Sequence, residues 1–133
     1  MDTKDTNLKT TASTPIDRES IRQLLEPYVQ LPLECDGMTR VITYLLQTAK
    51  IPHRVYVGTI HFNVKGKGEF SPHFWIRLGT ETGEIIDYRS RMWFGGDMDI
   101  PQGIFKEDPK VISYDGREIA LPVSKTVFSI LTG

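Results

Sequence analysis

The chain of 133 residues contains one cysteine, Cys35, and no apolar run near the roughly 18 residues that a membrane span needs. A single cysteine excludes an internal disulfide and any zinc site built on several thiolates. Residues 1–14 are polar and lack the apolar stretch of a secretory signal. We therefore expect a cytoplasmic protein with no membrane segment and no bound metal.

The sequence also lacks an excess of either charge. It has 16 basic and 17 acidic residues and a formal net charge of −1. Domains that bind nucleic acid usually carry a basic stripe, so nucleic acid is not expected as the main partner. The length suits one domain with a core of its own. We expect a disordered tail over residues 1–14 and a single domain over residues 15–133.

The first half of the domain has a helical pattern. A helix is predicted over residues 17–26, and a proline-containing connector follows over residues 27–34. The next helix starts at Cys35 and Asp36 and ends before Pro52. Its apolar residues recur every three or four positions, which makes one face apolar. They are Met38, Val41, Ile42, Leu45, Leu46 and Ala49.

The second half has a strand pattern. Residues 54–64, 73–78 and 84–88 are predicted strands, because they are rich in β-branched and aromatic types. Residues 89–109 contain several glycines and prolines and are expected to form a long loop. Asp115 and Gly116 predict the turn of a hairpin over residues 110–121. The segment 122–131 fits either a strand or a helix. Helices first and an antiparallel sheet afterwards define an α+β fold.

The register of one predicted hairpin bears on function. A three-residue loop at 80–82 pairs Ile76 with Ile86. His73 and Asp87 then share one face as diagonal neighbours, with Cβ atoms roughly 7–8 Å apart. A loop of two or four residues would place them on opposite faces unless a bulge intervened. We expect the two side chains to form a hydrogen bond on the face turned toward the helix that starts at Cys35.

A thiol at a helix start is suited to nucleophilic attack. Unpaired N–H groups and the helix dipole favour a thiolate there, and the Cys35 N–H can stabilise an oxyanion. The neighbouring Glu34 and Asp36 oppose this, because like charges disfavour the thiolate. A histidine held by a carboxylate supplies the base that such a nucleophile needs. Together, Cys35, His73 and Asp87 point to a catalytic triad.

Each of these residues also has a simpler interpretation. A lone cysteine is often a small buried apolar side chain, and His73 and Asp87 could be solvent-facing ends of strands. His61, within residues 54–64, is the competing candidate for the base. Asp97 and Asp99 form a D-x-D pair, but nearby ligands are lacking, so a solvated loop is preferred to a metal site. The combination of the three residues in this order favours catalysis.

Four segments carry a resemblance to a known family. Cys35 is followed by DGMTRVITYLL, and residues 51–58 read IPHRVYVG, residues 73–75 HFW, and residues 84–88 EIIDY. In this order the set resembles a transglutaminase-like domain, a branch of the papain-like cysteine enzymes. The resemblance implies a helix bearing the nucleophile packed on an antiparallel sheet. It also implies Cys35 as nucleophile, His73 as general base and acid, and Asp87 as the residue that orients the histidine.

The chain departs from this family at two positions. Phe74 stands where the family has a small residue between the histidine and the tryptophan. Asp36 stands where larger transglutaminases often have a tryptophan after the nucleophile, which argues against protein cross-linking. The resemblance covers about residues 35–88, so much of the last third of the chain lies outside it.

The expected function is that of a thiol hydrolase that cleaves an amide or related acyl bond without a cofactor. Its substrate would be a peptide, a protein or a small amide. Trp75, Arg89, Arg91 and Trp93 are the candidates for substrate binding. One alternative is an acyltransferase that passes the acyl group to an amine. The other is an inactive binding module of the same fold that uses residues 89–109 for recognition. The oligomeric state stays open.

Overall fold

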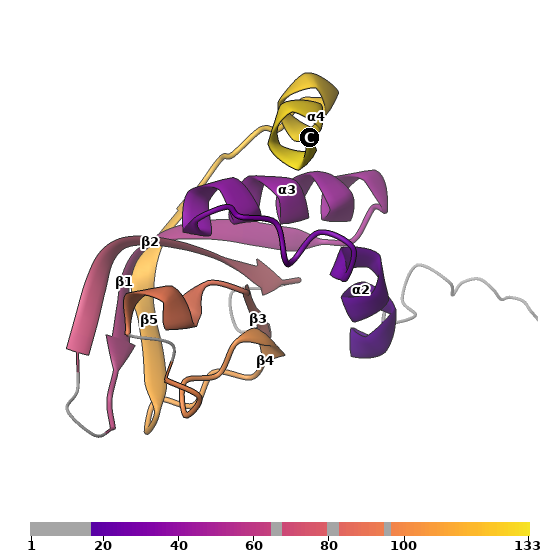
Figure 1. Ribbon diagram of the computed structural model, residues 1–133. Helices are drawn as coiled ribbons and strands as arrows, with labels where there is room; N and C mark the ends of the chain where they lie inside the picture. Colours follow the sequence, from indigo (N-terminus) through magenta and orange to yellow (C-terminus); the bar gives the residue numbers. More distant parts are fainter. Residues whose placement is uncertain (1–16, 65–67, 80–82, 95–96) are drawn as a thin grey trace, which may run out of the picture.

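The computed structural model describes residues 17–64, 68–79, 83–94 and 97–133. The predicted tail over residues 1–14 and the hairpin loop at 80–82 lie outside them. The described chain is α+β, with three α-helices and a five-stranded antiparallel sheet. The helix α3 lies across one face of the sheet, and the segment after β3 lies on the other side (Figure 1). No helix in the described ranges is long and apolar enough to cross a membrane.

The helices follow the sequence pattern closely. Helix α2 spans Arg18–Leu25, and the Asp17 side chain caps it by accepting a hydrogen bond from the Ser20 N–H at 2.8 Å. Helix α3 spans Cys35–Thr48 and buries the predicted apolar stripe except Ala49, which is the exposed C-cap residue. Helix α4 spans Lys125–Thr132 and settles the choice left open for the last segment. It packs on α3 through Phe128, whose ring stacks on Tyr44 with centroids 4.4 Å apart.

The strands lie in the order β4-β3-β2-β1-β5. Strand β1 spans His53–Phe62 and β2 spans Gly68–Leu78. Strand β3 spans Ile85–Asp87, β4 spans Gly103–Phe105 and β5 spans Ile112–Ile119. The long strands β1, β2 and β5 bend strongly, so that the sheet curls around the segment that follows β3 (Figure 1).

The predicted hairpin register is confirmed. Ile76 pairs with Ile86 and Arg77 with Ile85, and the Leu78 N–H donates to the Glu84 carbonyl at 2.9 Å. This register places His73 and Asp87 on the same face of the sheet.

The two faces of the sheet are buried in different surroundings. Ile76 and Ile86 belong to the core that contains the apolar stripe of α3. Trp75 and Ile85, which share a face with His73 and Asp87, belong to a second core formed with residues of β1, β5 and the segment after β3. The expectation that the His73 face is turned toward α3 is therefore wrong, since that position is taken by the aliphatic face.

The hairpin predicted at Asp115 and Gly116 is also wrong. Both residues lie inside β5, which pairs continuously with β1 and sets Gly116 opposite Gly58. A Cβ added at Gly58 would come within 2.2 Å of the Asp115 carbonyl oxygen, and one at Gly116 within 2.4 Å of the Val57 carbonyl oxygen. Glycine is needed here for close approach of two backbones and not for a turn.

The described residues of the segment 89–109 have more regular structure than the sequence suggests. It contains a 3-10 helix, η2, over Ser90–Trp93 and the edge strand β4, which pairs Ile104 with Ile86. Ile100 and Ser90 are fully buried. The segment is thus part of the scaffold of the second core.

Candidate active site

His73 and Asp87 form a buried pair across β2 and β3. The His73 Nε2 atom lies 2.7 Å from the Asp87 Oδ2 atom, and the two side chains are 0% and 2% exposed. The hairpin register accounts for this contact, since the side chains are diagonal neighbours on one face. The hydrogen bond expected from the sequence is present.

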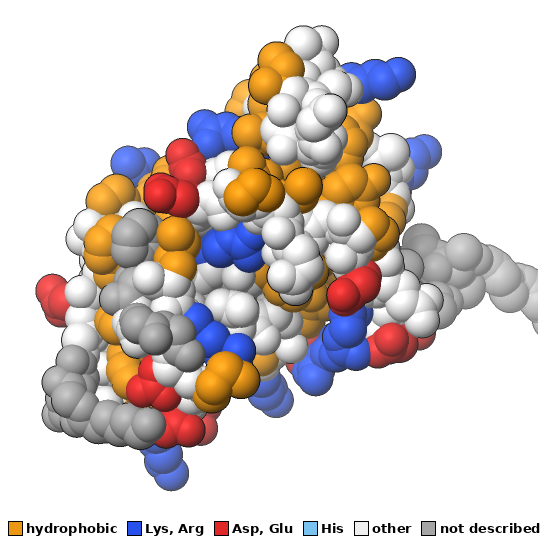
Figure 2. Space-filling view, in the orientation of Figure 1, with side chains coloured by type: hydrophobic (Ala, Val, Ile, Leu, Met, Phe, Trp, Pro, Cys, Tyr) orange, Lys and Arg blue, Asp and Glu red, His pale blue; other side chains and the backbone are white. Residues whose placement is uncertain are grey.

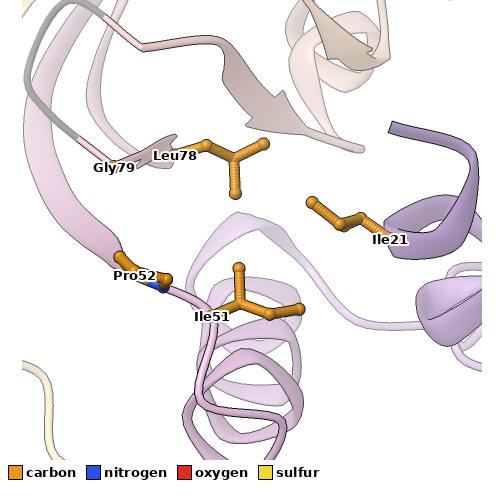
Figure 3. Close-up of a pocket in the computed structure, with 5 residues that line it drawn as sticks. All are labelled: Ile21, Ile51, Pro52, Leu78 and Gly79. Carbon is orange, nitrogen blue, oxygen red and sulfur yellow. The ribbon is translucent and has the colours of Figure 1, made fainter. Parts of the chain in front are cut away.

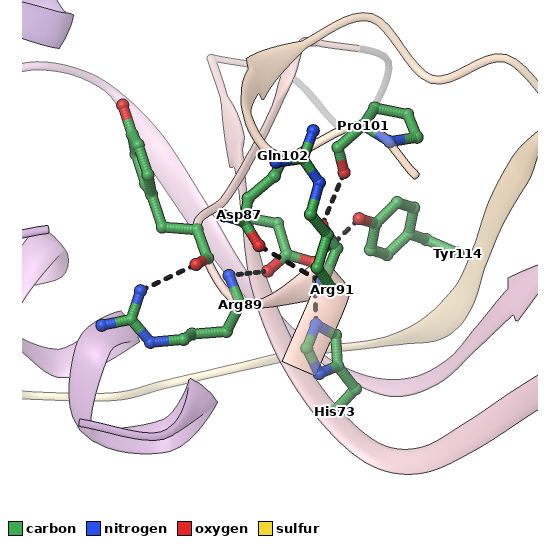
Figure 4. A network of polar contacts seen from close by, with 9 residues as sticks. His73, Asp87, Arg89, Arg91, Pro101, Gln102 and Tyr114 are labelled. Atoms are coloured by element: carbon green, nitrogen blue, oxygen red, sulfur yellow. Dashed lines mark hydrogen bonds and ion pairs between the residues drawn. The ribbon is translucent and has the colours of Figure 1, made fainter. Parts of the chain in front are cut away.

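Asp87 is held by two further donors besides His73. The Tyr114 hydroxyl donates to Oδ2 at 2.8 Å, and the Arg89 N–H donates to Oδ1 at 3.0 Å (Figure 4). Burial, followed by the charge of Asp87, raises the pKa of Tyr114 well above its usual value. Tyr114 is therefore a neutral hydroxyl that can only serve Asp87 as a donor, which fixes the carboxylate as an acceptor for His73.

Cys35 reaches the pair from the start of α3. It is buried, with 6% of its surface exposed, and it is a free thiol. Strand β3 pairs with β2 only at Ile76 and Arg77, so the edge of β2 beside His73 is not covered by β3. The first turn of α3 lies against this stretch, where Cys35 adjoins Pro72 and Phe74.

The electrostatics favour a protonated His73. Burial lowers the pKa of His73, but the charge of Asp87, the hydrogen bond to Asp87 and a hydrogen bond with Cys35 together raise it to about 9. Because Nε2 is bonded to Asp87, the other ring nitrogen, Nδ1, is the one left for the thiol. The arrangement is thus a chain from thiol to imidazole to carboxylate, in which a positive imidazole adjoins the sulfur.

Arg89 ties the two ends of the site together. Its Nε atom donates to the Leu33 carbonyl at 2.6 Å, and its Nη2 atom donates to the Leu31 carbonyl at 2.7 Å. Its Nη1 atom donates to the Tyr88 carbonyl at 2.7 Å. The side chain therefore fixes the connector before Cys35 to the end of β3. These bonds give Arg89 a positioning role, and its contact with substrate stays a prediction.

Two of the other predicted substrate ligands, Trp75 and Arg91, have contacts within the protein. Trp75 is 1% exposed and packs on Tyr114, with ring centroids 4.9 Å apart, so the expectation that it contacts substrate is not supported. The Arg91 Nε atom donates to the Ile100 carbonyl at 2.8 Å, which holds the turn before β4. The Trp93 side chain lies outside the part of the chain that the structure describes.

The remaining candidates have separate contacts. His61 lies in β1 with its Nδ1 atom 3.4 Å from the Glu69 Oε1 atom, and His53 Nδ1 lies 2.8 Å from the Ile51 carbonyl oxygen. The Asp99 N–H donates to the Asp97 side chain at 2.9 Å, which closes a local turn. Within the described ranges no group of three or more His, Cys, Asp and Glu side chains could hold a metal ion.

Two surface hollows lie near the two ends of α3. One, of about 240 Å³, adjoins Cys35 and is lined by the start of α3 and by β2. The other, of about 230 Å³, is lined by apolar side chains around Ile51 and Leu78 (Figure 3). It lies at the opposite end of α3, a helix of 14 residues and so roughly 20 Å long. Of these two hollows, the first is the one that adjoins the thiol.

Tyr114 is the site residue that the sequence did not reveal. It lies on β5, which is separated from β3 by β2 and β1 in the sheet. It meets Asp87 because the sheet curls, and curl has no local sequence signal. Its place in β5 was further hidden by the turn predicted at Asp115.

Comparison of the chain with protein-family models, with curated proteins and with solved structures gives no match.

Proposed function

We propose that this protein is a cysteine hydrolase that cleaves an amide or related acyl bond through an acyl-enzyme on Cys35. The observation that carries the proposal is the buried chain of contacts from Cys35 to His73 to Asp87. Isolated buried histidine–carboxylate pairs do occur for structural reasons. A thiol on the other side of the imidazole, next to a surface hollow, favours chemistry.

In the proposed reaction the Cys35 sulfur attacks the carbonyl carbon while His73 carries the proton of the thiol. The oxyanion forms beside the first N–H groups of α3, which have no acceptor within the helix. His73 then gives its proton to the leaving amine as the carbon–nitrogen bond breaks, and a thioester remains. Water, deprotonated by His73, attacks the thioester, releases the carboxylic acid and returns the proton to the thiol.

The proposal includes the fold type and the setting. A helix that starts at the nucleophile and adjacent strands that carry histidine and aspartate resemble the transglutaminase-like core of papain-like enzymes. The free thiol is suited to a reducing compartment such as the cytoplasm. Transfer of the acyl group to an amine uses the same first step, and the two outcomes differ only in the second nucleophile.

The proposal is tested with p-nitrophenyl acetate, an activated ester that most thiol enzymes accept as an acyl donor. We expect a burst of p-nitrophenolate and the mass increase of one acetyl group on Cys35 in the intact protein. Cys35→Ala should abolish the burst, and His73→Ala should slow it by about 10²–10⁴-fold. Glu118→Gln, an exposed change on β5, is the matched control.

A primary amine, added to the purified acetylated protein after the excess ester is removed, then separates hydrolysis from transfer. Formation of the acetylated amine faster than from an acetylated free thiol indicates transfer, whereas release of acetate alone indicates hydrolysis. A protein in which Cys35 is acetylated no faster than a free thiol, with no effect of His73→Ala, would instead be an inactive binding module.

A further inference from the structure

The hollow beside Cys35 has an apolar side. Phe70, Pro72 and Phe74 line it from alternate positions of β2, so they lie on one side of the strand. Its volume of about 240 Å³ is below the roughly 300–1,000 Å³ of pockets that hold a drug-sized molecule. The hollow therefore suits one side chain or one small group next to the reacting carbonyl.

The other side of this hollow is acidic. Glu34 and Asp36 line it, and both are exposed. In Figure 2, acidic side chains lie next to hydrophobic ones over the start of α3, at the left of the view. Arg40 approaches Asp36, with Nη1 3.9 Å from Oδ2, a long contact between exposed side chains. Among the ion pairs of the described residues none includes Glu34.

Among the described residues Arg89 is a further cation near the thiol, besides His73, and it does not neutralise this rim. Arg89 interacts electrostatically with Cys35 and Asp87, but its guanidinium donates to the carbonyls of Leu31, Leu33 and Tyr88. It is directed toward the connector before α3 and is not among the residues that line the hollow. Among the described residues, the lining thus has two carboxylates and no basic side chain.

These carboxylates give the rim of the hollow a negative charge that a bound substrate would meet. A positive group on the bound substrate would offset both charges and would be attracted to them. It could also contact the faces of the aromatic side chains.

From this combination we infer that the site selects acyl substrates that carry a positive charge close to the reacting carbonyl, such as a basic residue of a peptide or a small cationic amide. The inference rests on the proposed function, and it assigns Glu34 and Asp36 as residues that determine specificity. The apolar stem of a lysine or arginine side chain would lie against Phe70 and Phe74, with its charge at the rim.

The test uses charged thiol reagents, because Cys35 is the only cysteine of the chain. The rate of modification by cationic methanethiosulfonate ethyltrimethylammonium is divided by the rate for anionic methanethiosulfonate ethylsulfonate. The same ratio for 2-mercaptoethanol corrects for intrinsic reactivity. We expect the corrected ratio to be 10-fold or more at low salt and to fall as salt is added.

Three variants make the test specific. Glu34→Gln should lower the ratio several-fold, and Glu34→Gln combined with Asp36→Asn should bring it close to that of the free thiol. Glu118→Gln changes the net charge by the same amount as Glu34→Gln. The exposed Glu118 side chain lies in β5 and forms an ion pair with Arg54. This variant should leave the ratio unchanged.

The outcomes separate this inference from the proposed function. Fast modification that depends on His73, with the charge ratio of a free thiol, overturns the inference and leaves the hydrolase standing. Slow modification by both reagents, unaffected by His73→Ala, overturns both. A cation preference seen only when amines capture the acetylated Cys35 would assign the acidic rim to an acceptor, and it would contradict selection of a cationic acyl donor.

Discussion

The two faces of the β2–β3 hairpin are buried equally well but by different means. On the α3 side, Ile76 and Ile86 are 0% and 1% exposed and contact aliphatic side chains. On the other side, His73 and Asp87 are 0% and 3% exposed and depend on hydrogen bonds. An aliphatic face contributes stability through its packing, whereas a buried polar pair is tolerated only while every member has a partner. Within one hairpin, the aliphatic face therefore supports the fold, and the polar face carries the proposed catalytic residues.

The largest expected effect on stability belongs to the aliphatic face. Ile76→Ala should lower the free energy of unfolding by about 2–5 kcal/mol, because it leaves a cavity between the sheet and α3. In the molecules that stay folded, Cys35 should be acetylated by p-nitrophenyl acetate at the wild-type rate. Urea denaturation followed by tryptophan fluorescence, together with the p-nitrophenolate burst, measures both quantities. A variant that keeps its free energy of unfolding but shows a slower p-nitrophenolate burst would mean that the aliphatic face also supports the active site.

The polar face should make stability depend on pH. The pKa of His73 is about 9 in the folded protein against 6.5 for an ordinary histidine, so the folded state binds the proton more tightly. The resulting stabilisation is complete below pH 6.5 and is lost as pH rises to about 9, by roughly 3 kcal/mol.

Asp87→Asn should remove most of this dependence, because the carboxylate is the main group that raises the pKa of His73. Urea midpoints measured from pH 6 to pH 9 provide the check, with Ile76→Val as a control that keeps the slope. Equal slopes in Asp87→Asn and the wild type would mean that the His73–Asp87 pair does not carry the charge assigned to it.

Tyr114→Phe should have the smallest effect of the set. It removes one hydrogen bond to a carboxylate that keeps two other donors, at a cost of about 1.5–3 kcal/mol. With one donor fewer, the Asp87 charge acts more strongly on His73, so the pKa of His73 should rise further. NMR titration of the His73 ring resolves this, and a fall in that pKa would contradict the assigned role of the tyrosine.

The sequence predicted what depends on local pattern. The apolar stripe of α3 and the alternation around Ile76 and Ile86 are enough to set the helix, the hairpin register and hence the face shared by His73 and Asp87. Each of these features follows from residues that are near in the chain.

The sequence did not predict features that depend on contacts between distant segments of the chain. Gly116 has the local signature of a turn, but the close approach to Gly58 of β1 requires a glycine inside a strand. Tyr114 meets Asp87 only because the whole sheet curls. The carbonyl groups that Arg89 binds lie in the connector before α3, and only the structure shows them. Contacts over long sequence distances set all three features, and at Gly116 they override local propensity.

The central claim is that Cys35 is activated by His73, and the rate of iodoacetamide alkylation tests it directly. Cys35 is the only cysteine, so mass spectrometry of the intact protein reports it alone. We predict that at neutral pH the wild-type protein reacts at least 10-fold faster than His73→Ala, when both are folded by circular dichroism. Equal rates in the two proteins, at the level of a simple thiol, would contradict the account.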